Sequence, residues 1–180
     1  MAKKKPCYIN LIPAEIKRGQ VGYARTTGFM GLLIRFGEWL KWRNGDVNHA
    51  FVITEEGKDY ENIWVVQATL RGVVRSTLQS VIDGGYSVLI YDNPAGVVPE
   101  MVAEFAENEV GKPYGILSIL CIALDITTPD WFIAFRRNWT WICSALTGEA
   151  MRYGGWYHSI PDIYTTTPAQ LKAAHLECLE

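Results

Sequence analysis

Short apolar segments rich in β-branched residues alternate with turn residues in the first half of the chain, a pattern typical of strands. The segments that predict strands are 20–25, 49–54, 62–69, 73–75 and 87–91. Residues 55–59 (Glu-Glu-Gly-Lys-Asp) form a turn signal between the second and third of them. We therefore expect 49–54 and 62–69 to pair as a hairpin.

Helical spacing of apolar residues appears at 28–42 and dominates the second half of the chain. There the pattern predicts helices at 97–110, 116–124, from 128, at 141–153 and at 169–175. Gly111 and the pair Gly154-Gly155 follow two of these helices, as is common at helix C-termini. Strands followed by helices favour an α+β fold over a βαβ repeat.

Length, composition and charge narrow the protein class. The 180 residues suit one domain, which we expect to span 1–180. With 49% hydrophobic and 20% charged residues, neither disorder nor a coiled coil is expected. The net charge of −2 gives no electrostatic basis for a nucleic-acid partner. The most apolar stretch, 115–124, is about half as long as a membrane span, so no transmembrane segment is expected.

The N-terminus shows no pattern of a signal peptide. Its basic residues are followed by Pro6 and polar residues rather than by an apolar run. This favours a cytoplasmic location, with bacterial and viral origins both left open.

The cysteines indicate thiol chemistry rather than disulfides or metal binding. The chain has four cysteines, none in a CxxC pair and none with His at zinc-ligand spacing, so we expect no metal and no cofactor. Cys121 lies in an apolar segment and is expected in the core. Cys143 lies in the first turn of the expected helix 141–153, where unpaired N–H groups and the helix dipole favour a thiolate. The alternative interpretation of Cys143 is a small packed residue.

Two polar residues on the predicted hairpin could assist such a thiol. His49 opens one strand, and the hairpin could bring Gln67 of the other strand beside it to orient the imidazole ring. The alternative interpretations are a structural histidine and a solvent-facing glutamine. His158, in a loop, is a weaker alternative base, and His175 near the C-terminus is expected to be exposed.

Four motifs in order give these residues a context. They are a histidine strand, turn, second strand and Ala…Gly-Val at 48–78, EFAENEVGKPYG at 104–115, TWICSALTGEAMRYGG at 140–155 and TTTPAQL at 165–171. This series resembles the permuted papain-like enzymes, the YaeF/YiiX-like relatives of the NlpC-type cysteine hydrolases, over about residues 16–172. The resemblance implies a circularly permuted papain-like fold, in which a small antiparallel sheet packs against helices.

The resemblance also implies roles for individual residues. The implied catalytic residues are Cys143 as nucleophile, His49 as general base and Gln67 as the third polar residue, and the implied substrate-binding residues are Tyr23, Tyr114 and Ser144. Ser144 and the Cys143 backbone would border the oxyanion hole, and the two tyrosines would belong to the cleft wall.

Three positions depart from the family pattern. Gln67 stands where the family often has an acid or a histidine, and an amide stabilises an imidazolium less than a carboxylate does. Ala145 replaces the acid of the family's CSEL motif, and Gly19-Gln20 replaces its early Gly-Asp. These departures leave room for weak or altered activity.

Three functions follow as hypotheses. The first is a cysteine-dependent amidase or peptidase that acts on a small peptide or a peptidoglycan fragment. The second is a lipid acyl hydrolase or acyltransferase, in which Trp39 and Trp42 of the segment 28–42 would face a lipid. For the segment 28–42, packing against the sheet is favoured over contact with a lipid. The third is a catalytically weak binding module, which Gln67 and Ala145 favour.

Overall fold

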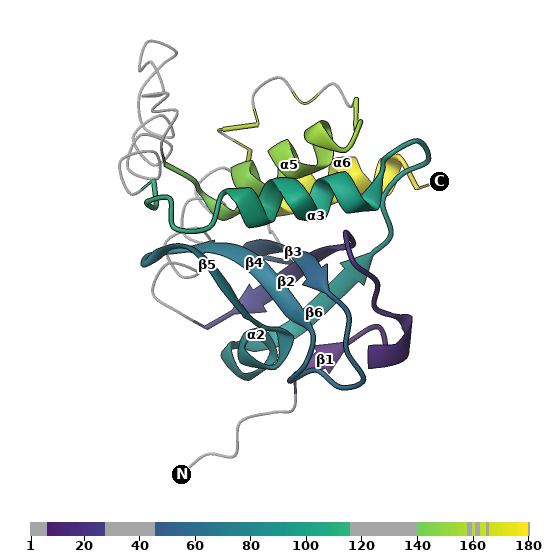
Figure 1. Ribbon diagram of the computed structural model, residues 1–180, viewed down its shortest axis with the longest axis vertical. Coiled ribbons are helices and arrows are strands. Elements are labelled where there is room, and N and C mark those ends of the chain that lie inside the picture. Colours follow the sequence, from purple (N-terminus) through teal and green to yellow (C-terminus); the bar gives the residue numbers. More distant parts are fainter. Residues whose placement is uncertain are drawn as a thin grey trace.

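The computed structural model describes residues 7–27, 46–115, 140–157, 160, 163–164 and 166–179. In this part of the chain the strands form one sheet of order β1-β6-β2-β3-β4-β5 (Figure 1). The strands are β1 (Tyr8–Ile9), β2 (Val21–Thr26), β3 (His49–Glu55), β4 (Trp64–Thr69), β5 (Gly72–Thr77) and β6 (Gly85–Tyr91). The short β1 pairs with β6 in parallel, and the other neighbouring strands pair antiparallel.

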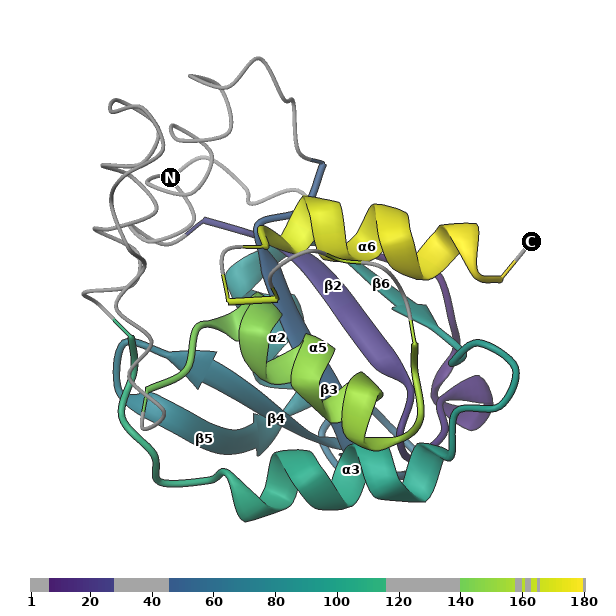
Figure 2. The same cartoon turned by 90° about the horizontal axis from the view of Figure 1, so that it is seen from above.

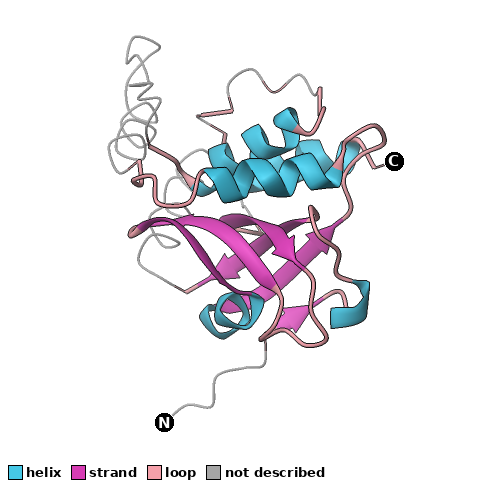
Figure 3. Cartoon of the chain, in the orientation of Figure 1, coloured by secondary structure: helices cyan, strands magenta, loops and turns pink. Residues whose placement is uncertain are grey.

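Helices cover both faces of this sheet. The described helices are the 3-10 turn η1 (Pro13–Glu15) and the α-helices α2 (Leu78–Gly84), α3 (Pro99–Asn108), α5 (Cys143–Tyr153) and α6 (Pro168–Glu177). Helices α3, α5 and α6 lie on one face, and α2 lies on the other (Figures 1 and 3). Seen from above, α5 lies between α3 and α6 (Figure 2). The expected α+β class is confirmed, with a mostly antiparallel sheet.

The period of two along the strands divides the apolar side chains between two clusters. The cluster under α3 and α5 contains Ala50 and Val52 of β3 and Val66 and Ala68 of β4. The cluster on the α2 face contains the alternate residues, among them Phe51, Ile53 and Val65. Both faces of the central strands are therefore buried in apolar contacts.

The predicted hairpin is confirmed. Strands β3 and β4 pair antiparallel, with Val52 opposite Val66. The expected helix at 97–110 is α3, and Gly111 follows it with φ 91°, the left-handed conformation that glycine adopts without strain. The Gly111 amide donates to the Val73 carbonyl at 2.9 Å, which joins the end of this segment to the edge strand β5.

Other elements differ from expectation. Helix α2 was not predicted, although Thr77 caps it by accepting from the Ser80 amide and Leu78 and Val81 are buried at helical spacing. The expected helices at 28–42, at 116–124 and from 128 lie outside the described residues, as do Cys121 and His158. Among the described residues no helix is long and apolar enough to cross a membrane.

The expected exposure of His175 is wrong. Helix α6 turns this side chain inward, and it is 0% exposed. Its Nε2 lies 2.8 Å from the Asp92 carbonyl oxygen, and its Nδ1 lies 3.1 Å from the Tyr23 hydroxyl. Because a carbonyl oxygen only accepts, Nε2 donates to Asp92 and the Tyr23 hydroxyl donates to Nδ1. Two satisfied ring nitrogens allow this imidazole to be buried.

Candidate functional site

His49 and Gln67 meet on the central strands. The His49 Nε2 lies 2.6 Å from the Gln67 Oε1, within the range of a strong hydrogen bond. The backbone before His49 is fixed by Asn48, whose side chain accepts from the Thr26 amide at 2.8 Å and donates to the Thr26 carbonyl at 3.0 Å. The predicted contact between Gln67 and the His49 ring is therefore present.

The amide of Gln67 also has a partner at its other end. Its Nε2 donates to the Ser76 hydroxyl at 2.7 Å, so its Oε1 is the atom that faces His49. An amide oxygen accepts only, and the hydrogen of this bond must therefore sit on the His49 Nε2. The neutral ring then keeps Nδ1 unprotonated, and Nδ1 is the nitrogen able to act as a base.

The environment of His49 favours the neutral ring. Burial lowers the pKa of His49 below its ordinary value, and the hydrogen bond to Gln67 opposes this effect in part. His49 is half-buried, and the centroid of its ring lies 6.4 Å from the centroid of the Phe51 ring. A neutral imidazole at neutral pH is the form that a general base requires.

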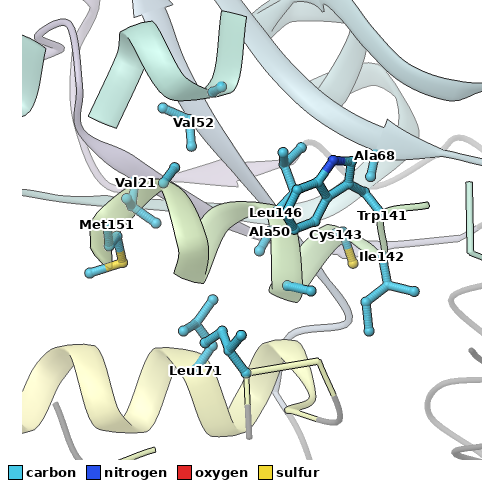
Figure 4. Close-up of a cluster of buried hydrophobic side chains, with 14 of the residues drawn as sticks. Val21, Ala50, Val52, Ala68, Trp141, Ile142, Cys143, Leu146, Met151 and Leu171 are labelled. Carbon is cyan, nitrogen blue, oxygen red and sulfur yellow. The ribbon is translucent and has the colours of Figure 1, made fainter. Parts of the chain in front are cut away.

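Cys143 is the first residue of α5, as predicted. The N-terminal N–H groups of a helix have no partner within the helix, so this turn can stabilise a thiolate or an oxyanion. Cys143 forms no disulfide and is 2% exposed, packed in the apolar cluster under α3 and α5. Figure 4 draws it with Ala50, Ala68 and Trp141 of that cluster.

Two neighbouring segments fix the turn before Cys143. Trp141 forms a parallel bridge with Tyr114: its amide donates to the Pro113 carbonyl at 3.1 Å, and its carbonyl accepts from the Gly115 amide at 3.0 Å. The Trp141 indole donates to the buried Glu109 carboxylate at 2.5 Å. No sequence pattern indicated this role for Glu109, because the bond joins residues 32 positions apart.

Tyr114 lies close enough to Cys143 for the two side chains to interact electrostatically. Burial and, second, the negative charge of a Cys143 thiolate raise the pKa of the Tyr114 hydroxyl. This residue was expected at the cleft wall, and it is half-buried beside the predicted nucleophile. Its hydroxyl stays protonated at neutral pH and can donate a hydrogen bond.

The other two expected substrate-binding residues have structural partners. Tyr23 is 0% exposed and bonds to His175 within the core, so it offers no surface to a substrate. The Ser144 hydroxyl donates to the Thr166 carbonyl at 2.5 Å, and this residue is also buried. The part of Ser144 that is in a position typical of an oxyanion hole is its backbone amide, in the first turn of α5.

The two parts of the candidate site belong to opposite faces of the sheet. Helix α5 packs on β3 and β4, and Ala50 and Ala68 of its apolar cluster directly follow His49 and Gln67 in the chain. By strand alternation, His49 and Gln67 project on the Phe51 face. Cys143, at the start of α5, belongs to the cluster on the other face, with Ala50 and Ala68. The structure therefore brings His49 to Gln67 but places the Cys143 side chain on the opposite face from both.

In the described part of the chain, no group of three or more His, Cys, Asp or Glu could hold a metal ion.

Comparison with protein-family models and with curated proteins finds no match for this chain.

Proposed function

We propose that the protein is a cysteine-dependent hydrolase of amide bonds, with Cys143 as nucleophile, His49 as base and Gln67 as the residue that orients His49. The observation that carries this proposal is the 2.6 Å bond between His49 Nε2 and Gln67 Oε1. It leaves Nδ1 as the basic nitrogen, on the strand that α5 packs against from the other face. The proposed substrates are small peptides or peptidoglycan fragments.

The proposed reaction proceeds through a thioester. His49 Nδ1 takes the proton of Cys143, and the sulfur attacks the carbonyl carbon of the substrate. The first-turn N–H groups of α5 stabilise the tetrahedral oxyanion. The C–N bond then breaks, and the amine leaves with the proton from His49. Water, deprotonated by His49, attacks the thioester and releases a carboxylic acid and the Cys143 thiol.

The test is hydrolysis of a panel of peptide amides and peptidoglycan fragments, with lipid acyl esters as a separate arm. We expect Cys143→Ala to abolish turnover and His49→Ala to reduce it by roughly 10²–10⁴-fold. Cys178→Ala, at a half-buried cysteine after α6, is the matched control and should keep full activity. Turnover at the normal rate in Cys143→Ala refutes the proposal, and activity confined to the lipid arm corrects the substrate class.

A second candidate function is a papain-like binding module without catalysis. The observation that favours it is the burial of Cys143, of which 2% is exposed, in an apolar cluster. A substrate reaches such a sulfur only when neighbouring side chains move. Under this function Cys143→Ala leaves binding of peptide fragments unchanged, and no member of the panel is turned over.

A further inference from the structure

Ser76 lies at the end of a chain of three polar side chains that crosses β3, β4 and β5. The chain runs from His49 Nε2 to Gln67 Oε1 at 2.6 Å, and from Gln67 Nε2 to Ser76 Oγ at 2.7 Å. Ser76 stands opposite Val65 in the β4–β5 ladder, on the face to which Gln67 also points. All three side chains are half-buried.

We propose that Ser76 is a positioning residue, which holds Gln67 with its Oε1 toward the His49 ring. This inference rests on the proposed function for its catalytic meaning. Ser76 acts through Gln67, because the hydrogen bonds that link it to His49 pass through the two ends of one amide group.

The need for Ser76 follows from the chemistry of an amide. A carboxylate presents an acceptor to the ring in either orientation, whereas an amide presents an oxygen at one end and an NH₂ group at the other. Only the oxygen end can accept from the His49 Nε2 and stabilise an imidazolium. A glutamine side chain also has several rotatable bonds and loses conformational freedom when it is fixed. Ser76 supplies a partner for the NH₂ end and thereby favours the productive orientation.

Arg75, the charged residue before Ser76 on β5, has partners of its own. Arg75 of β5 forms an ion pair with Glu55 of β3, and the Arg75 guanidinium lies 4.6 Å from the centre of the Trp64 ring. Alternation places Arg75 on the opposite face from Ser76. The hydrogen bond that orients the His49 ring is the one to the neutral Gln67.

The experiment is an NMR titration of the His49 ring in the full chain. Ser76→Ala should lower the pKa of His49 by roughly half a unit to one unit, because the hydrogen bond that His49 donates to Gln67, which raises this pKa, weakens. Ser76→Thr keeps the hydroxyl and should keep the wild-type value. In a Gln67→Ala background, Ser76→Ala should change nothing. Ser87→Ala, at a half-buried serine of β6, is the control.

An unchanged His49 pKa in Ser76→Ala overturns the inference, as does an equal drop in the Gln67→Ala background. If Ser76→Ala unfolds, Ser76→Cys replaces it, since sulfur is a weak acceptor in a side chain of similar size. The alkylation rate of Cys143 is measured in the same variants. A His49 pKa that responds as expected without any change in this rate sustains the role of Ser76 and refutes the proposed coupling of His49 to Cys143.

Discussion

His175 joins α6 to the sheet, and its removal should destabilise the fold strongly. The ring contacts Tyr23, Tyr91 and Trp156 at centroid distances of 5.9, 6.2 and 6.4 Å. Replacement by alanine leaves a cavity among these rings. It also leaves the fully buried Tyr23 hydroxyl without the acceptor that it has in the native fold.

The magnitude follows from these two effects. Loss of a buried ring and an unsatisfied buried hydroxyl together should lower the free energy of unfolding of His175→Ala by about 3–5 kcal/mol. The Asp92 carbonyl adds little, because Asp92 is exposed and water can replace the ring nitrogen. Tyr23→Phe removes the hydroxyl alone and should cost about 1 kcal/mol.

Urea denaturation followed by tryptophan fluorescence measures these values. In the double variant Tyr23→Phe/His175→Ala the loss should be smaller than the sum of the single losses by about 1–2 kcal/mol, because the two groups share one hydrogen bond. Leu179→Ala, at an exposed residue after α6, is the control and should stay within about 0.5 kcal/mol of the wild type. A loss below about 1 kcal/mol in His175→Ala, or strictly additive losses, would refute the reasoning.

The remaining predictions concern pH, one buried hydrogen bond and one helix cap. Burial lowers the pKa of His49 and His175, so the unfolded chain binds more protons below about pH 6.5. Thermal denaturation should therefore show stability falling from pH 7.5 to 5.5; constant stability contradicts this. Glu109→Ala leaves the Trp141 N–H unpaired and should cost about 1–3 kcal/mol in urea. Thr167→Ala removes the cap of α6 and should lower the free energy of unfolding by about 1 kcal/mol. If either variant is as stable as the wild type, the stabilising role of the contact that it removes is refuted.

Local patterns predicted much of the fold. Apolar segments rich in β-branched residues predicted β3 and β6, and the turn signal at 55–59 predicted the hairpin. The two-residue strand β1 could not be predicted, because it exists only through its parallel pairing with β6, far along the chain. Residues buried on more than one side of α6, such as Lys172 and His175, hide the amphipathic pattern that would have revealed its buried face.

The candidate site was predictable where its parts are local. Cys143 at a helix start and Gln67 across a hairpin from His49 both follow from short-range patterns. Ser76 and Glu109 could not be found in this way, because their roles depend on strand register and on a contact between distant segments. The burial of Tyr23 depends on α6, whose position the sequence pattern does not specify.

The central claim is that the Cys143 sulfur and the His49 imidazole share a proton. The most direct test is the pH dependence of Cys143 alkylation in a chain whose other cysteines are replaced by serine, with and without His49→Ala. A shared proton predicts an apparent thiol pKa well below the ordinary value of about 8.5, which returns toward that value when His49 is removed. An ordinary thiol pKa that is the same in both proteins would show that the two groups share no proton.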